Sequence, residues 1–428
     1  MTAVLFPFSV RSETLSDTIS RALTTHPQVE AGKAVGEAAR KSVWEQRAGF
    51  FPTVSASARA GRINADDDTT RANTGADAYS WLGEGNLTLT QPLFAGFSVM
   101  NRTQAAKERV LSAEEELSTT AEDLSLKAAR AHLNVMRTKE LLAHATSYMQ
   151  AIRTRRENID LMVREGAADQ AELMQAEEIY MAARTTELGY LEAYRQAEAA
   201  YIEMTGGLPE GELSLGDAFW DSLVPQTIDE ALGQASAESP RLRAADKTVS
   251  ALEHETDAER GLILPRLDAE LSYLEKDQDD DLGGELSSAQ AMLKMSWNFS
   301  TGGGQLARVA RGLEQKKEAQ ARRADTLRTV ELEVRQKHTS MQIVDEQYGL
   351  YLEREKTSQS ILDTYLSQFE GGQQSNLQLI SAQAKLFEAA AARTDAYYRR
   401  LLARFELLSA MGRLRHAFAP SPQADQPG

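Results

Sequence analysis

Residues 266–273 read Arg-Leu-Asp-Ala-Glu-Leu-Ser-Tyr, a stretch in which polar and apolar side chains alternate at every position. A period of two is typical of a β-strand whose two faces meet different surroundings. A second alternating stretch begins at Ala289, and weaker versions occur near Val54 and near Leu87. The sequence therefore predicts four strands, at about 53–63, 85–94, 266–275 and 288–299.

These strands have the length, about 9 to 11 residues, that a tilted crossing of a bilayer requires, with the apolar side toward lipid. No stretch reaches the roughly 18 consecutive apolar residues of a membrane-spanning helix, so strands must make any crossing. Four strands leave two unpaired edges, and the smallest closed membrane barrel has about eight strands. Several subunits must then share one barrel, and physics alone permits two, three or four copies.

Aromatic residues gather at the ends of the predicted strands. Girdles of this kind favour membrane–water interfaces, although hairpins in soluble sheets also carry aromatics. The residues that we assign to the interface are Trp81, Phe94, Trp297 and Phe299. The connecting segments contain Asp66-Asp67-Asp68 and Asp279-Asp280-Asp281, and we expect them to be exposed loops.

The sequence contains an internal repeat, so that its two halves are similar. Phe51-Pro52 returns as Leu264-Pro265, while Gly96 and Gly206 return as Gly302 and Gly412. Each half reads as helix, strand, loop, strand, very long helix, tight turn and long helix. We therefore predict a two-fold internal repeat. The first repeat spans 14–206 and the second spans 227–412, and an equatorial linker at 207–226 joins them. We expect residues 1–13 to be an N-terminal remnant or the end of an export signal, and residues 413–428 to be a disordered tail.

The longest helices show a heptad pattern. Residues 98–164 contain neither Pro nor Gly, and seven of the eight positions at a spacing of seven from Val110 to Ile159 are apolar. Eight of ten such positions from Leu306 to Phe369 are apolar as well. A heptad repeat held this long predicts coiled-coil helices, here in two hairpins at about 98–204 and 303–412. Glycines at Gly166 and at 371–372 mark the hairpin tips.

Composition narrows the function. The net charge of −16 argues against nucleic acid as a partner, and the absence of cysteine excludes thiolate catalysis and cysteine metal sites. The six histidines have no ligand spacing, and the chain has no nucleophile motif or phosphate loop. We therefore expect no enzyme, no cofactor and no metal. A soluble coiled-coil scaffold remains the alternative, although it leaves the strand pairs unexplained.

Several short motifs occur in a fixed order: the Thr14-Leu15-x-Asp17 opening, the His26-Pro27 and Ser239-Pro240 helix starts, and the strand exit Gln91-Pro92-Leu93-Phe94-x-Gly96. With the double occurrence, this order resembles the TolC-like outer-membrane efflux family, from Thr14 to Gly412. The resemblance implies a homotrimer in the lipid of the Gram-negative outer membrane. Its fold would be α+β, a twelve-stranded transmembrane β-barrel continued by a periplasmic α-helical barrel.

The resemblance also implies a function. The trimer would be a passive exit duct for type I protein secretion or small-molecule efflux. It would be docked by a periplasmic membrane-fusion adaptor protein and an inner-membrane transporter, either of ABC type or proton-driven. The sequence does not choose between these cargoes or these pumps.

In this family the periplasmic gate and the adaptor contacts lie at the hairpin tips. The family's acidic lumen ring falls on Gln378 and Ser381, which carry no charge. The aromatic and basic residues of the closed aperture fall on Phe369 and Gln374, and their acidic partner falls on Glu172. A salt-bridged lock is not expected, because Gln374 has no cation. The expected tip residues are Gly166, Glu172, Phe369, Gly371, Gly372, Gln374, Gln378 and Ser381.

Overall fold

The computed structural model describes residues 12–64, 79–216, 218–278, 285–298, 301–371 and 373–418. The chain divides into two compact units. The first comprises Met1–Lys33, Glu115–Leu242 and Asp325–Gly428, and the second comprises Ala34–Glu114 and Arg243–Ala324. Both predicted Asp-Asp-Asp segments, together with Phe299 and Gly372, lie outside the described residues.

Two helices, two strands and two helices follow one another in an order that occurs twice. The first run is α1 (Leu15–Thr25), α2 (Pro27–Ala48), β2 (Thr53–Ile63), β3 (Ser80–Phe94), α4 (Ser98–Arg164) and α5 (Gln170–Thr205). The second run is α6 (Ile228–Glu238), α7 (Pro240–Gly261), β5 (Arg266–Gln278), β6 (Glu285–Ser296), α8 (Gly304–Glu370) and α9 (Asn376–Ala410). The short elements are β1 (Glu13–Thr14), β4 (Leu213–Ser214), the 3₁₀ helix η1 (Ala218–Leu223) and α10 (Leu414–Ala417).

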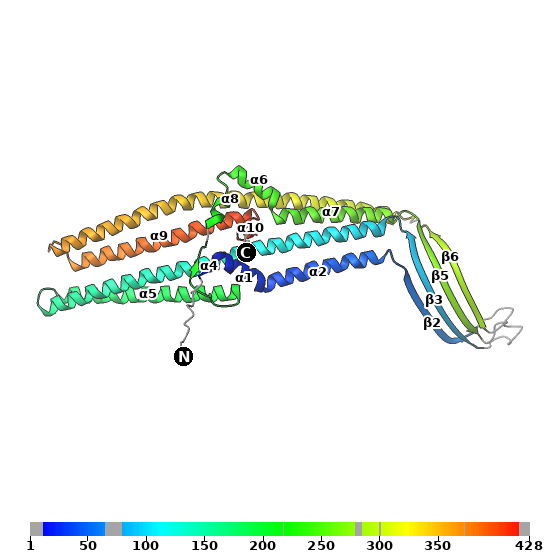
Figure 1. Cartoon of the computed structure of the whole chain (residues 1–428), viewed down its shortest axis with the longest axis horizontal. Helices are drawn as coiled ribbons and strands as arrows, with labels where there is room; N and C mark the ends of the chain where they lie inside the picture. Colours follow the sequence, from blue (N-terminus) through cyan, green and yellow to red (C-terminus); the bar gives the residue numbers. More distant parts are fainter. Residues whose placement is uncertain are drawn as a thin grey trace, which may run out of the picture. The chain divides into compact units, whose positions relative to one another are not determined.

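The second unit contains an antiparallel sheet of four strands in the order β2-β3-β5-β6 (Figure 1). Some strand ends differ from the predicted ones. β3 begins at Ser80 rather than at 85, because β2 pairs with it as far as Ile63 and needs a partner there. β6 ends at Ser296, which is opposite Arg266, the first residue of β5. Trp297 therefore follows the strand instead of lying in it.

The first unit consists mainly of two helical hairpins, with α5 along α4 and α9 along α8 (Figure 1). The heptad positions Leu124, Ile152 and Ile159 of α4 are buried, as the repeat predicts. In α8, Val334 is buried, but Leu306, the first position of the predicted seam, is 68% exposed. Across the described ranges, no helix is both long and apolar enough to span a bilayer.

The end of the chain is ordered further than predicted. Leu414 and Phe418 are buried in the main core of the first unit, where the ring of Phe418 meets the edge of Phe405. The carboxylate of Glu122 accepts the backbone N–H of Arg415 at 3.1 and 3.2 Å. The prediction of disorder from residue 413 is therefore wrong for 413–418, because this segment buries apolar side chains. Residues 419–428 lie outside the described part of the chain.

The other terminal segment and the linker also contain paired backbone. Glu13 and Thr14 form β1, which pairs in parallel with Leu213 and Ser214 of β4. The predicted segment 1–13 therefore ends in a strand residue, and the predicted linker 207–226 includes β4 and η1.

Candidate functional site

One face of the sheet carries apolar side chains across all four strands. The register sets Val54 opposite Leu89, Leu89 opposite Leu271, and Leu271 opposite Ala291. Val54 and Leu271 are exposed, as is the neighbouring Tyr273. Apolar area in water costs about 25 cal/mol per Å², and a contiguous exposed patch of it marks a contact with membrane or protein. This face of the sheet is therefore more stable against lipid or another apolar surface than in water.

The opposite face of the sheet is mostly polar. The equivalent row one residue along is Ser55, Thr88, Ser272 and Gln290. Charged side chains on this face pair across strands, as Glu270 Oε2 does with Lys294 Nζ at 3.6 Å. Asp268 is 7% exposed, and its two carboxylate oxygens accept the Nε–H of Arg266 at 2.7 and 2.8 Å. This face suits contact with water in a lumen.

The predicted interface aromatics lie at the two ends of the sheet. Trp81 is opposite Arg62, near the loop that joins β2 to β3. Phe94 is the last residue of β3, and its ring meets Phe97 edge-on at a centroid distance of 5.3 Å. Trp297 follows β6 at the same end as Phe94, and its indole N–H donates to the carbonyl of Ile263 at 2.9 Å.

The first hairpin tip joins α4 to α5. Gly166 has a φ of 75°, a left-handed conformation that strains residues with a side chain. The N–H of Ala167 donates to the carbonyl of Met162 at 2.7 Å and closes the end of α4. Asp169 begins α5 by accepting the N–H two residues later at 3.3 Å. Glu172, in the first turn of α5, forms no side-chain hydrogen bond or ion pair among the described residues.

The second tip joins α8 to α9 through a capping box. The N–H of Gln378 donates to Ser375 Oγ at 3.4 Å, and the N–H of Ser375 donates to Gln378 Oε1 at 3.1 Å. The amide of Gln378 is therefore engaged by its own helix start. Gln374 Nε2 donates to Gln368 Oε1 at 2.8 Å, while Ser381 is exposed one turn further along α9.

Phe369 lies at the end of α8, before Gly371, whose N–H donates to the carbonyl of Ser367 at 3.3 Å. Its ring packs beside the buried Leu379 of α9. The guanidinium carbon of Arg155, on α4, lies 5.6 Å from the centroid of this ring. Such a cation–π contact contributes about 0.5 to 1 kcal/mol at an exposed site. Phe369 therefore joins the two hairpins through Arg155.

The two tips share a small core within the first unit. Ile380 of α9 packs with Ile152 and Ile159 of α4 and with Ala176 of α5. The structure therefore brings the two tips together. Among the described residues, Gln374 is hydrogen-bonded to Gln368 and not to Glu172.

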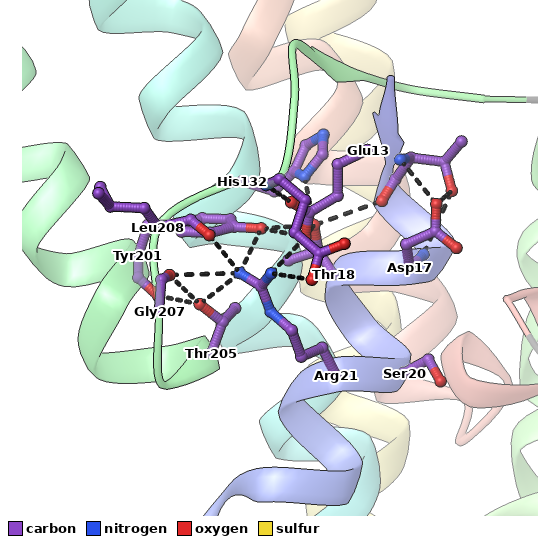
Figure 2. A network of polar contacts seen from close by, with 12 residues as sticks. Glu13, Asp17, Thr18, Ser20, Arg21, His132, Tyr201, Thr205, Gly207 and Leu208 are labelled. Atoms are coloured by element: carbon purple, nitrogen blue, oxygen red, sulfur yellow. Dashed lines mark hydrogen bonds and ion pairs between the residues drawn. The ribbon is translucent and has the colours of Figure 1, made fainter. Parts of the chain in front are cut away.

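A polar network holds the N-terminal segment in the first unit (Figure 2). Arg21 Nη2 donates to the hydroxyl of Tyr201 at 3.2 Å and to Thr205 Oγ1 at 2.9 Å. Arg21 Nη1 lies 3.4 Å from Glu13 Oε1, which also accepts the hydroxyl of Tyr201 at 2.5 Å. This arrangement satisfies the charge of the buried Glu13 and ties β1 and α1 to α5.

His132 completes the network from α4. Its Nε2 lies 3.1 Å from the carbonyl of Ser214, so Nε2 carries the proton and Nδ1 accepts the hydroxyl of Thr18 at 2.8 Å. Burial lowers the pKa of His132 to about 4, so the ring is neutral near pH 7. The geometry assigns this histidine a structural role.

The two-faced sheet and the long helical hairpins define the class of a membrane-channel protomer, and comparisons with known proteins agree. The family model described as outer membrane efflux protein matches residues 18–207 and 231–413. The chain is 25% identical over 417 residues to the outer membrane efflux protein BepC of Brucella suis biovar 1, covering 94% of this chain and 86% of the relative.

Solved structures share the fold. The Campylobacter jejuni CmeC outer membrane channel superposes with a TM-score of 0.78 at 15% identity, covering 94% of this chain and 86% of that one. The open state of the Neisseria gonorrhoeae MtrE outer membrane channel gives a TM-score of 0.76 at 17% identity, covering 96% and 94%. The chain belongs to the outer membrane efflux protein family. It is an outer-membrane efflux channel that extends into the periplasm, and the scaffold alternative is not favoured.

Sequence reasoning missed Arg155 as a tip residue. The signal was present as a basic run, because Arg153, Arg155 and Arg156 stand within four residues shortly before the first tip. Arg156 pairs with Glu177 across the first hairpin at 2.5 Å, whereas Arg155 points to the second hairpin. The pairing of an arginine on one hairpin with an aromatic ring on the other depends on packing that heptads alone do not specify.

Proposed function

We propose that three copies of the chain form the exit duct, with four strands from each protomer closing a twelve-stranded barrel that continues as a periplasmic α-helical barrel. The observation that carries the proposal is the open two-faced sheet. Its edge strands β2 and β6 each carry backbone groups that need partners in lipid, and pairing β2 of one copy with β6 of the next supplies them. The family resemblance favours three copies over two or four.

Exposed apolar stripes on the long helices support association of copies. On α5, Met174, Met181 and Leu188 follow one another at a spacing of seven, and all three are exposed. On α8, one helix face exposes Leu332, Ile343, Leu350 and Ile361. Heptad stripes of this kind are normally covered by another helix, so α5 of one protomer packs against α8 of the next in the proposed trimer.

The internal repeat has a role in this duct. We propose repeats at 14–206 and 227–412, joined by the linker 207–226, because the same order of elements occurs twice. Each protomer then contributes two similar hairpins, and six hairpins surround one lumen. The aromatics Trp81, at one end of the strands, and Phe94 and Trp297, at the other, would form the two membrane-interface girdles.

The hairpin tips are the proposed periplasmic gate and adaptor contact. The duct would receive cargo from an inner-membrane transporter, of ABC or proton-driven type, through a periplasmic adaptor protein. Contacts such as Arg155 with Phe369 and Gln374 with Gln368 are individually weak, so adaptor docking can displace them. Both type I protein secretion and small-molecule efflux fit this arrangement.

Ion conduction across a planar lipid bilayer tests the proposed duct. The purified protein should give discrete conductance steps. Ser272→Arg, on the polar face, should shift the reversal potential in a salt gradient toward anion preference. Leu271→Met, on the neighbouring apolar face, should leave that potential unchanged. A membrane-inserted protein without conductance, or equal potentials in the two variants, would contradict a lumen lined by the polar face.

A further inference from the structure

We infer that the second unit contains a binding pocket for a phosphate group, between the first turns of α4 and α8 and the last turns of α7. The cavity has a volume of about 300 Å³. Its charged lining residues are Arg102, Arg109, Arg308, Arg311, Glu255 and Glu259. Nothing in the outer-membrane duct itself requires such a concentration of guanidinium groups in a chain of net charge −16.

The charges of the pocket are not balanced. Glu259 is shared by two arginines, with Arg308 Nε 3.4 Å from one carboxylate oxygen and Arg102 Nη2 3.9 Å from the other. Glu255 pairs with Arg109. Arg311 has no ion pair among the residues that the structure describes. Four guanidinium groups against two carboxylates leave a surplus of two positive charges, which an anion can neutralise.

The shape of the pocket follows from small residues in its floor. Ala105 and Ala258 are buried there, and Gly312 lies so close to α7 that a Cβ atom would be 2.9 Å from Thr256 Oγ1. The helices therefore come together beneath the pocket, while the longer arginine side chains stand around its rim. These side chains are about half exposed, so a ligand can reach them.

The guanidinium groups at the rim of the pocket favour phosphate as the ligand. Guanidinium groups are planar forks that bind two oxygens of one phosphate with charge-assisted hydrogen bonds. A single ammonium would bind an anion as a point charge, whereas several converging arginines favour a tetrahedral oxyanion with several oxygens. The neighbouring amides of Gln46 and Gln315 also line the pocket and add neutral donors.

At the position of the pocket, two kinds of molecule can supply the phosphate group. Arg102 and Arg308 are each the fifth residue of their helices, about 6 Å of helical rise from the helix starts that follow the strands. If the strands cross the bilayer, which rests on the proposed function, the pocket lies near the periplasmic headgroup layer. The phosphate can then belong to a lipid headgroup or to a free phosphate or phosphorylated solute.

Calorimetric titration of the detergent-purified assembled protein with inorganic phosphate, at low ionic strength, tests the site. The double variant Arg102→Gln/Arg308→Gln should weaken binding at least about ten-fold, because it removes two charge-assisted contacts. Arg311→Gln should weaken it several-fold. Glu255→Gln should strengthen it, since it raises the positive surplus. The control Arg322→Gln, on the same helix but paired with Glu318 outside the pocket, should leave binding unchanged.

A separate experiment tests whether the bound phosphate belongs to a lipid headgroup. Wild-type protein is reconstituted in nanodiscs containing phosphatidylglycerol and phosphatidylcholine in equal amounts, and the lipids that stay bound after detergent extraction are counted by native mass spectrometry. Loss of retained phosphatidylglycerol in the double variant supports a lipid headgroup. Loss of inorganic phosphate binding with unchanged lipid retention supports a free ligand.

One set of results overturns the proposal: no inorganic phosphate binding and no difference in retained lipid between wild type and the double variant. If the double variant fails to assemble, the phosphate affinities of Arg311→Gln and Glu255→Gln decide. Arg311→Gln breaks no ion pair among the described residues, and Glu255→Gln breaks only the partly exposed pair with Arg109. Opposite changes in affinity support the pocket, and equal affinities overturn it.

Discussion

Apolar side chains are buried in the helical hairpins and exposed on one face of the sheet. Ile152, on the α4 seam, is 0% exposed, whereas Leu271 and Leu293 on the sheet are 53% and 66% exposed. Both regions are amphipathic with the period of their secondary structure. Periodicity therefore identifies which side chains share a face, while the medium outside that face decides whether the chain itself covers it. Water surrounds the hairpins, and lipid surrounds the sheet in the proposed duct.

The largest expected effect is in the buried core of the helical unit. Phe405 is fully buried and meets Trp220 edge-on at a centroid distance of 4.8 Å. Phe405→Ala should lower the free energy of unfolding by about 3 to 5 kcal/mol, because it leaves a cavity. Urea unfolding followed by circular dichroism measures this. Glu353→Ala, an exposed change on α8, should shift it by less than about 0.5 kcal/mol. Equal effects would mean that burial does not stabilise this unit.

The second effect tests the medium around the sheet. Leu271→Arg should destabilise the folded protein in lipid vesicles by about 2 to 4 kcal/mol if the residue lies near the midplane. Ser272→Arg, its neighbour on the polar face, should cost less than about 1 kcal/mol. Asp268 is a poorer control, because it is buried and bound to Arg266. Equal costs in urea titrations of vesicle-inserted protein would show that the two faces meet the same medium.

The third effect concerns the C-terminal segment. Burial raises the pKa of Glu122 to about 7, although the backbone N–H of Arg415 partly opposes the shift. A folded-state pKa above that of the unfolded chain gives stability that is complete below about pH 4.5 and is lost as the pH rises through about 7. The free energy of unfolding should therefore fall by roughly 1 to 3 kcal/mol between pH 4.5 and 8 from this group.

Glu122→Gln should flatten this pH dependence, because it removes the titrating group. Glu116→Gln, an exposed change on the same helix, should keep the wild-type slope. Denaturant unfolding at several pH values compares the three proteins, and an unchanged slope in Glu122→Gln would assign the dependence to other groups.

The smallest effect is at the tips. Phe369→Ala and Gln374→Ala should each raise the resting single-channel conductance, because each removes a contact at the proposed gate. Ala60→Ser, on the sheet, should change it little. Arg155→Gln should shift the closed-to-open ratio about two- to five-fold for each cation–π contact that it removes, one in every protomer of the proposed trimer. The double variant Arg155→Gln/Phe369→Ala should open no further than Phe369→Ala alone. Additive effects would show that the two residues act separately.

Much of the fold could be predicted from local pattern. Strict alternation in 266–273 predicts a strand, and the heptads of α4 predict a buried seam at Ile152 and Ile159. Strand ends could not be predicted from one strand alone, because β3 extends to Ser80 only where β2 pairs with it. The order in 413–418 depends on Leu414 reaching a distant core, which periodicity does not show.

The site was less predictable than the fold. The tip residues follow from the family resemblance, but Gln378 has a local role in a capping box that its position does not reveal. The contact of Arg155 with Phe369 joins helices about 200 residues apart in sequence, so it becomes visible once both hairpins are folded together.

In the proposed duct, the open edges of the sheet are closed by further copies of the same chain. Native mass spectrometry of the protein released from detergent micelles measures the number of copies directly. The proposed duct requires a complex of three chains, which persists at dilution because β2 of each copy pairs with β6 of the next. A stable, folded monomer of 47.1 kDa would contradict the shared barrel.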